Sequence, residues 1–352
     1  MKKKIIFCLL AAVMISVTGC NSATESAGEQ NADAIAKAIA EETTSEEELE
    51  KELEKELVEQ GETTTETETK VEEEEFPANV IPPRYTPNFD GERGTIELIT
   101  YEAKDYIKNT DSVEKKAYVY LPAGYSEDKQ YNVLYLMHGI GGNEAEWGLK
   151  DEKTSKVKKI MDNMVGNGEI EPFIIVCPNG RAMACEKEDG VQAFYYFGQE
   201  LRYDLIPYIE SHYSTYGGDP TSDSYDMTAA RNHRAMAGLS MGGMQTINIG
   251  ICECLDIISW FGAFSAAPTS YPASQLAKAI DDSEYDIDYF YNICGLQDTT
   301  AYNSAAAAAK TVDTLTDKLT AGENFCWQEK DGAHNFNIWY LGFYNLARVI
   351  FR

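Results

Sequence analysis

Positive charge is scarce in this chain. Its 352 residues include 30 Lys and Arg against 58 Asp and Glu, which gives a formal net charge of −28. Binding to nucleic acid phosphates requires basic surface, so the composition argues against nucleic acid as a partner. A hydrophobic fraction of 43%, with 22 Tyr, 13 Phe and 4 Trp, can build a large core and excludes a wholly disordered chain.

Cysteine is present in no pattern that predicts cross-links. Cys252 and Cys254 are two residues apart, which is poor disulfide geometry and is not the spacing of a zinc site. Most of the cysteines beyond the N-terminal segment lie in apolar stretches, where a thiol usually behaves as a small buried hydrophobe. We therefore expect no disulfide framework, no metal site and no cofactor. These cysteines are Cys177, Cys185, Cys252, Cys254, Cys294 and Cys326.

Long hydrophobic runs are also missing. The apolar run from Ile5 to Val17 follows three lysines and is too short for a comfortable transmembrane span, but it has the charge and length of a secretory signal. Val17-Thr18-Gly19-Cys20 resembles a bacterial lipobox, whose cysteine receives a diacylglyceryl group before cleavage. We expect residues 1–19 to be a lipoprotein signal peptide and Cys20 to hold the protein on the outer side of the bacterial cell membrane. Plain secretion with an incidental Cys20 is the alternative.

Aromatic residues are nearly absent from the next segment. Residues 20–76 contain 20 acidic and 4 basic residues, a net charge of −16. Glu/Thr runs such as 63–68 cannot bury apolar area, so the composition predicts an acidic low-complexity tether over residues 20–85. Ser45 followed by Glu48 resembles a capping box and favours a helix over 45–60.

The remainder, residues 86–352, alternates β-rich runs with helical patterns. In 198–211, for example, Leu201, Leu205 and Ile209 recur every four residues and mark one buried helix face. Such alternation predicts an α/β domain, a mostly parallel central sheet of about eight strands with helices on both faces. We predict helices over 198–211, 303–320 and 336–351, and strands over 95–102, 115–122, 132–138, 173–178, 233–239, 258–265, 288–295 and 325–330.

A G-x-S-x-G motif follows one of these strands. Gly238-Leu239-Ser240-Met241-Gly242 stands between the predicted strand 233–239 and a helical stretch, which is the context of a nucleophile elbow. The glycines are needed because the turn is tight, and the serine hydroxyl is then exposed at the carboxyl edge of the sheet. We therefore predict that Ser240 is a catalytic nucleophile. The alternative is a glycine-rich turn with an incidental serine.

A serine nucleophile needs a base, and the chain has only four histidines. His233 begins the strand that leads to Ser240, about 23 Å away at about 3.3 Å per residue. His212 ends a helix that leads to the same far edge, and His138 belongs to a glycine-rich segment with another role. His334, in a loop after the last strand, is the predicted base.

A carboxylate should orient this imidazole from another strand end. Asp298 follows the predicted strand 288–295, whereas Asp331 is only three residues from His334, a poor separation for two side chains that must meet. We choose Asp298 over Asp331, which gives the chain order Ser240, Asp298, His334.

The oxyanion of a tetrahedral intermediate needs two N–H donors. The amide of Met241, directly after the nucleophile, is one candidate. We assign the second to Ile140, in the glycine-rich loop after the third strand, with Gly139 and Gly141 shaping the loop beside the substrate. A phosphate loop is a weak interpretation of this cluster, because the Lys-Ser/Thr pair is missing.

These motifs together resemble carbohydrate esterase family 1, and especially the feruloyl esterase domains attached to bacterial xylanases. The resemblance covers nearly all of 90–352, through segments 118–125, 133–142, 207–211, 233–243, 265–268 and 334–339. It implies an α/β-hydrolase fold, a triad of Ser240, Asp298 and His334, and hydrolysis of hydroxycinnamoyl or acetyl esters on xylan and its oligosaccharides. The chain departs from the family at Gln297, at Asn335 and in segment 181–193, which leaves the acyl preference open.

Three aromatic residues lie in or near loops at the strand ends. Trp147, Tyr271 and Trp339 are candidates for stacking on a phenyl ring or sugar, with ordinary packing as the alternative. The expected function is a serine feruloyl esterase. Its rivals are an acetylxylan esterase or general carboxylesterase and, from a different class, a glycan-binding lipoprotein on an inactive hydrolase fold.

Overall fold

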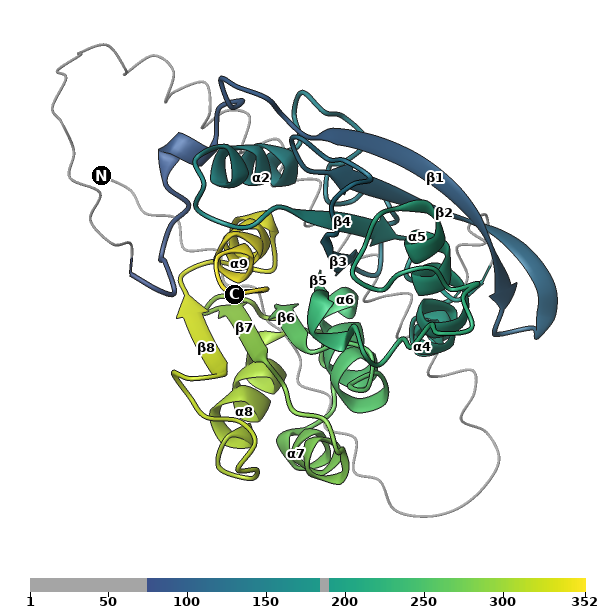
Figure 1. Cartoon of the computed structure of the whole chain (residues 1–352). Coiled ribbons are helices and arrows are strands. Elements are labelled where there is room, and N and C mark those ends of the chain that lie inside the picture. The colour runs from purple at the N-terminus through teal and green to yellow at the C-terminus, as the bar shows by residue number, and fades with distance from the viewer. Residues whose placement is uncertain (1–74, 184–189) are drawn as a thin grey trace, which may run out of the picture.

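The computed structural model describes residues 75–183 and 190–352. The signal peptide, Cys20, most of the tether with its 45–60 helix, and Cys185 lie outside these described residues. An eight-stranded sheet with the order β1-β2-β4-β3-β5-β6-β7-β8 organises the described part (Figure 1). The strands are β1 (Thr95–Asp105), β2 (Thr110–Leu121), β3 (Asn132–Met137), β4 (Phe173–Pro178), β5 (Arg234–Leu239), β6 (Trp260–Phe264), β7 (Tyr289–Gly295) and β8 (Phe325–Lys330).

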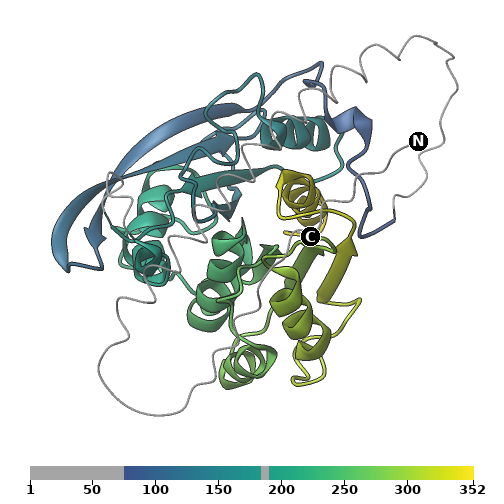
Figure 2. The same ribbon diagram turned by 180° about the vertical axis from the view of Figure 1, so that it is seen from behind.

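Each predicted strand is present, and the sheet is mostly parallel as expected. β2 pairs antiparallel with β1 and with β4, while the pairs from β4 through β3, β5, β6 and β7 to β8 are parallel. The long β1 and β2 curve away at one edge and β8 forms the other edge (Figures 1 and 2). The parallel strands bring the loops after β3, β5, β7 and β8 to one edge of the sheet, where the predicted catalytic residues lie.

Helices cover both faces of this sheet, and alternate residues of a strand face the two layers. The helices are α2 (Lys156–Gly166), α3 (Val191–Phe194), α4 (Phe197–Glu200), α5 (Ile206–His212), α6 (Met241–Gln245), α7 (Ala273–Asp282), α8 (Tyr302–Val312) and α9 (Phe336–Ala347), with short 3-10 turns at Pro83–Tyr85 and Arg231–His233 and π-helical turns at Leu201–Leu205 and Thr246–Ile251. In β3, Val133 and Tyr135 belong to a core cluster with residues of α4, α5, α7 and α8, whereas Leu134 and Leu136 belong to a second cluster with residues of α2 and α9.

The helix predicted over 198–211 is confirmed as α4, a π-helical turn and α5. The helix predicted over 303–320 is wrong in its second half, because α8 ends at Val312. There the hydroxyl of Thr314 donates to the carbonyl of Thr311, and side-chain hydrogen bonds of this kind compete with helix continuation. α2 and α7 were not among the predicted helices.

The folded part begins earlier than the predicted boundary at residue 86. Ala78 is buried, and its amide donates to Asn345 Oδ1 while its carbonyl accepts from Asn345 Nδ2, each at 2.9 Å. The Phe76 ring packs edge-on against Tyr289, and Tyr85 is buried against Tyr344. Residues 75–85 therefore belong to the folded domain rather than to a tether. The sequence did not indicate this, because prolines in this segment follow an acidic run and are typical of a tether. The partner of Ala78, Asn345, lies 267 residues further along the chain.

The five cysteines of the described residues are all free, and three of them, Cys177, Cys254 and Cys294, are buried. Burial raises the pKa of each of these thiols, as expected for cysteines that pack as hydrophobes. Within residues 75–183 and 190–352, no helix is long and apolar enough to cross a membrane.

Candidate active site

Ser240 stands at the sharp turn between β5 and α6. Its backbone has a φ of 51° and a ψ of −114°, a conformation that L-residues rarely adopt. A Cβ at Gly238 would lie 2.7 Å from the Gly242 carbonyl carbon, and one at Gly242 would lie 2.6 Å from the Met137 carbonyl oxygen. Only glycine fits at either position, so the motif forms the tight elbow that its spacing predicts.

His334 approaches this serine from the loop between β8 and α9. Its Nε2 lies 3.0 Å from Ser240 Oγ, and 7% of its side chain is exposed. The Trp339 ring meets the imidazole edge-on at 5.1 Å. Asn335, one of the departures from the family pattern, caps α9 by accepting a hydrogen bond from the Asn337 amide. The cap and the Trp339 ring fix the position of His334.

Asp298 completes the contact from the loop after β7. Its Oδ2 lies 2.7 Å from His334 Nδ1, and its Oδ1 accepts the amides of Thr300 and Ala301 at 3.0 and 2.8 Å. Burial alone would raise the pKa of this carboxyl, but hydrogen bonds from His334, Ala301 and Ser265 outweigh burial and lower it. The carboxylate is therefore ionised and acts as a fixed acceptor for the imidazole N–H.

The competitor Asp331 does not reach the imidazole. It is exposed, and its Oδ1 accepts from Gln297 Nε2 at 3.3 Å. The oxygen of the same Gln297 side chain accepts the Gly332 amide at 2.6 Å. Gln297, another departure from the family pattern, thus ties the loop after β7 to the loop after β8. The structure brings Ser240, Asp298 and His334 together and leaves Asp331 outside.

The predicted oxyanion loop, residues 138–142, lies against the serine. A Cβ on Gly139 would be 3.4 Å from the Ser240 Cβ. The Ile140 side chain packs in an apolar cluster with Met241, whose amide starts α6. Within the described residues, neither the Ile140 nor the Met241 amide has a backbone acceptor. Both amides are therefore available to a ligand oxygen, as the prediction requires.

Glu146 is a site residue that the sequence reasoning missed. Its Oε2 accepts the Gly139 amide at 2.7 Å and would collide with any Cβ at Gly142. Burial raises the pKa of this carboxyl, partly offset by the Gly139 hydrogen bond and by the charges of Arg181 and His334. An acid seven residues after a glycine carries no sequence signal of its own, so only the folded loop reveals the contact.

His138 supports the same loop as a neutral side chain. Its Nε2 accepts the Gly180 amide at 3.0 Å, so the proton lies on Nδ1, which donates to the Gly139 carbonyl at 2.7 Å. Burial, together with the charge of Arg181, lowers the pKa of His138 to about 3. A charged imidazole would turn a second N–H toward the Gly180 amide.

We expect this shift to make stability depend on pH. His138 has an ordinary pKa of 6.5 and a folded pKa of about 3, so between these values the unfolded chain binds the extra proton and the folded state does not. The contribution of neutral His138 to the free energy of unfolding is therefore complete above pH 6.5 and decreases as the pH falls from 6.5 toward 3. In urea titrations at pH 7 and pH 5, the stability of the wild type relative to H138Q should drop by about 2 kcal/mol. A difference that stays constant would contradict a buried neutral His138.

The other two histidines lie at the opposite edge of the sheet, as predicted. His233 stacks on Tyr216 at 3.9 Å and His212 stacks on Tyr208 at 4.0 Å. A cavity of about 950 Å³ at this edge is lined by His233, Tyr216 and Trp260, among others. No predicted site residue lines it, so we place the chemistry at the Ser240 edge, where the reactive groups converge.

The predicted substrate contacts of two of the three aromatic residues, Trp147 and Trp339, are wrong. Trp147 is 0% exposed, and its Nε1–H donates to the Met137 carbonyl at 3.0 Å within the core. Trp339 is 3% exposed and packs on the His334 ring. Neither can stack on a ligand without leaving the core. Tyr271 is half-buried beside Asn248, which accepts its amide, and Gly141 is exposed with open space at its Cβ.

An apolar cluster adjoins the nucleophile instead. It buries Phe194, Met241, Met244 and Ala267, and Ile140 packs against it. Met241 and Ile140 carry the two candidate oxyanion amides, so this cluster flanks the position where an ester carbonyl would sit. Its partly exposed members, Ile140, Val191 and Tyr195, provide an apolar wall beside Ser240.

A mostly parallel eight-stranded sheet covered by helices, with a serine elbow after β5 and a histidine after β8, defines the α/β-hydrolase fold. Residues 112–270 match the family model described as “Putative esterase”. The described part of the chain thus has the α/β-hydrolase fold, and its central segment is similar to an esterase family.

Two curated relatives match parts of this chain. It is 41% identical over 175 residues to Endo-1,4-beta-xylanase Y of Acetivibrio thermocellus, covering 48% of this chain and 15% of the relative. It is 27% identical over 275 residues to the Endo-1,4-beta-xylanase/feruloyl esterase of Xylanibacter ruminicola, covering 76% and 33%. The chain thus spans a third or less of these two relatives.

A solved structure matches over a greater share of its own length. A mutant of the feruloyl esterase module from Clostridium thermocellum, complexed with sinapinate, aligns with a TM-score of 0.64 and 28% identity. The alignment covers 78% of this chain and 93% of that chain. The chain is therefore similar to that module through most of the described fold.

Proposed function

We propose that this protein is a serine feruloyl esterase, which hydrolyses hydroxycinnamoyl groups ester-linked to xylan-type polysaccharide through an acyl-enzyme. The observation that carries the proposal is the connected path from Asp298 through His334 to Ser240 Oγ, at 2.7 and 3.0 Å, beside two available amides. The likeness to a feruloyl esterase module in complex with sinapinate supports an aromatic acyl group.

Acylation uses each of these groups in turn. Ser240 Oγ attacks the ester carbonyl carbon while His334 Nε2 accepts the hydroxyl proton. The carbonyl oxygen becomes an oxyanion, which the Met241 and Ile140 amides stabilise. His334 then gives its proton to the departing sugar oxygen as the carbon–oxygen bond breaks. The sugar leaves as an alcohol and the acyl group remains on Ser240.

Deacylation repeats the same chemistry with water. His334 takes a proton from a water molecule, which attacks the acyl carbonyl, and the same two amides bind the new oxyanion. Collapse of this intermediate returns the proton to Ser240 Oγ and releases the carboxylic acid. Throughout, the Asp298 carboxylate orients the imidazole and stabilises its charged form.

The apolar cluster beside Ser240 favours an aromatic acyl group over acetyl. Ile140, Val191 and Tyr195, the partly exposed members of this cluster, offer apolar surface next to the oxyanion amides, more than an acetyl group can cover. Desolvation of a phenyl ring there would supply binding energy that a two-carbon acyl group cannot. An acetylxylan esterase is the rival that this feature argues against.

A panel of three esters tests the proposal. We expect kcat/KM for methyl ferulate to exceed that for an acetyl ester by at least about 10-fold, because the apolar wall contacts only the larger acyl group. A short nitrophenyl ester should give a burst of nitrophenol, and S240A should give none. Faster release of acetate from acetylated xylan would favour the acetylxylan esterase, and no burst from the wild type would favour the inactive glycan-binding protein.

The N-terminal features, which lie outside the described residues, favour placing this activity on the cell membrane. Lipidation of Cys20 would hold the enzyme there by a diacylglyceryl group. Incorporation of labelled palmitate into the wild type but not into C20S tests this placement.

A further inference from the structure

Arg181 connects a second loop, residues 179–183, to the oxyanion loop 138–142. Its Nη1 donates to the Gly142 carbonyl at 2.8 Å and its Nη2 donates to the Ile140 carbonyl at 2.5 Å. The guanidinium also lies over the Phe194 ring, 4.8 Å from its centroid. Two hydrogen bonds and a ring contact therefore fix this planar group against the backbone that carries a candidate oxyanion amide.

These contacts matter because the oxyanion loop has little stiffness of its own. Gly139, Gly141 and Gly142 lack the Cβ atoms that would restrict the rotation of their peptide planes. The Gly142 amide donates to the Gly139 carbonyl at 3.3 Å, a long hydrogen bond. The orientation of each peptide in the loop must therefore come from partners outside it.

Loop 179–183 holds the peptides on both sides of Ile140. The Gly180 amide fixes the tautomer of His138, whose Nδ1–H then holds the Gly139 carbonyl. In a trans peptide the N–H points opposite to the carbonyl, so this bond turns the Ile140 amide away from His138. Arg181 holds the next carbonyl, that of Ile140, in the same manner.

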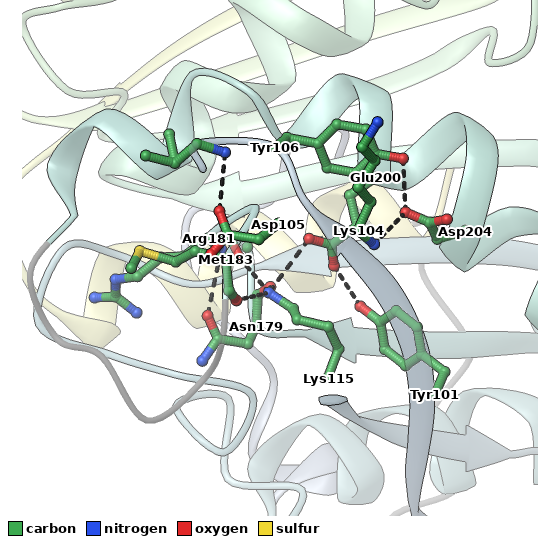
Figure 3. Close-up of polar contacts among 12 residues, drawn as sticks. Tyr101, Lys104, Asp105, Tyr106, Lys115, Asn179, Arg181, Met183, Glu200 and Asp204 are labelled. Carbon is green, nitrogen blue, oxygen red and sulfur yellow. Dashed lines mark hydrogen bonds and ion pairs between the residues drawn. The ribbon is translucent and has the colours of Figure 1, made fainter. Parts of the chain in front are cut away.

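A buried lysine fixes loop 179–183 in turn. Figure 3 shows the Lys115 ammonium facing the loop carbonyls, while the Arg181 side chain extends away from it. Lys115 Nζ donates to the carbonyls of Asn179 and Met183, each at 3.1 Å, and to the carbonyl of Arg181. Glu200 Oε2 lies 3.3 Å from Nζ and balances its charge, and the Lys115 side chain is 0% exposed.

The other oxygen of Glu200 is also engaged. Its Oε1 accepts the Tyr101 hydroxyl at 2.6 Å (Figure 3). A buried ion pair with its remaining polar atoms hydrogen-bonded has a defined geometry, and three loop carbonyls converge on it. Loop 179–183 is therefore a rigid support for Arg181 rather than a free surface loop.

We propose that Arg181 is a positioning residue of this esterase: it holds the Ile140–Gly141 peptide, which follows the oxyanion amide, and so keeps Ile140 in the position where its N–H faces the reacting carbonyl. This inference rests on the proposed function. Two hydrogen bonds of the Arg181 guanidinium end on carbonyls of the oxyanion loop, so the side chain supports that loop directly. Loss of this support should weaken stabilisation of the tetrahedral intermediate more than binding of the ester.

The test compares R181M with R231M on methyl ferulate. Arg231 is a matched control at the opposite edge of the sheet: it donates to the Leu255 and Asp286 carbonyls and lies over the Tyr285 ring at 5.4 Å. We expect R181M to lower kcat about 10- to 100-fold with KM within about 2-fold, since a misplaced oxyanion donor costs this much. R231M should keep kcat within about 2-fold.

The affinity for a tetrahedral inhibitor tests whether Arg181 acts on the oxyanion site. A substitution that only destabilised the fold would not weaken binding of this inhibitor selectively. Phenylboronic acid forms an adduct with a serine hydroxyl that mimics the intermediate, whereas free ferulate mimics only the ground state. R181M should lose affinity for the boronate by about the same factor as it loses kcat, and should bind ferulate as the wild type does. R181K, which restores one donor, should recover part of both losses, and it replaces R181M if that variant does not fold.

The outcomes separate this inference from the proposed function. A wild-type enzyme that neither hydrolyses esters nor binds the boronate refutes the proposed function itself. If the wild type is active, then an unchanged kcat in R181M, an effect on KM alone, or an equal loss in R231M overturns the role of Arg181. A loss of ferulate affinity as large as the loss of boronate affinity overturns it as well.

Discussion

Replacing Ser240 by alanine should reduce kcat about 10⁴- to 10⁶-fold on every ester, because in the part of the chain that the structure describes no other hydroxyl is hydrogen-bonded to His334. The residual rate would come from the oxyanion amides and from binding alone. The fold should be retained, since the backbone hydrogen bonds of residue 240 do not involve its hydroxyl: its amide donates to Phe264 and its carbonyl accepts from Met244 and Ala267. We expect the free energy of unfolding to change by less than about 1 kcal/mol.

The measurement is steady-state hydrolysis of methyl ferulate together with the nitrophenol burst. S211A is a suitable control, because Ser211 is exposed on α5 and its hydroxyl bonds only within its own helix and to His212. S211A should be as active as the wild type. Turnover by S240A within about 10-fold of the wild type would show that the acyl-enzyme forms elsewhere or not at all.

Ser240, His334 and Asp298 could be placed together from the sequence because each follows a strand. Parallel strands carry their carboxyl ends to one edge, so the loop position of each residue implies its spatial position. The G-x-S-x-G spacing adds a local constraint, since only glycine fits beside Met137 and Gly242. Strand positions were similarly accessible, because buried parallel strands form uniform apolar runs.

Other features depend on packing between distant segments and have no local signal. Trp147 and Trp339 follow strands as the catalytic residues do, yet they turn inward, one toward Met137 and the other onto His334. The packing of residues 75–85 on the domain depends on the hydrogen bond between Ala78 and Asn345, which is near the other end of the chain. Glu146 and Arg181 act through backbone atoms of the oxyanion loop, and a sequence does not indicate which side chain will reach a backbone group.

The D298N substitution should lower kcat about 10³- to 10⁴-fold, and the hydrogen bonds of Asp298 explain why an isosteric amide is so poor a replacement. Oδ1 accepts two backbone amides, those of Thr300 and Ala301, so this position requires an oxygen. The new NH₂ group must then occupy the place of Oδ2 and face His334 Nδ1. The imidazole would present Nδ1 as an acceptor and carry its proton on Nε2, toward Ser240 Oγ, where it can no longer act as a base.

D331N is the matched control for this change. Asp331 is closer to His334 in sequence, but its carboxylate pairs with Gln297 at 3.3 Å and is exposed. We expect D331N to keep kcat/KM within about 2-fold, since neutralising an exposed carboxylate leaves the imidazole untouched. Comparing the two variants on methyl ferulate distinguishes two effects. One is loss of the His334 tautomer that carries its proton on Nδ1, and the other is loss of negative charge near the site. A large defect in D331N with an active D298N would assign the orienting role to Asp331, and equal defects in both would show that charge rather than hydrogen-bond geometry governs the base.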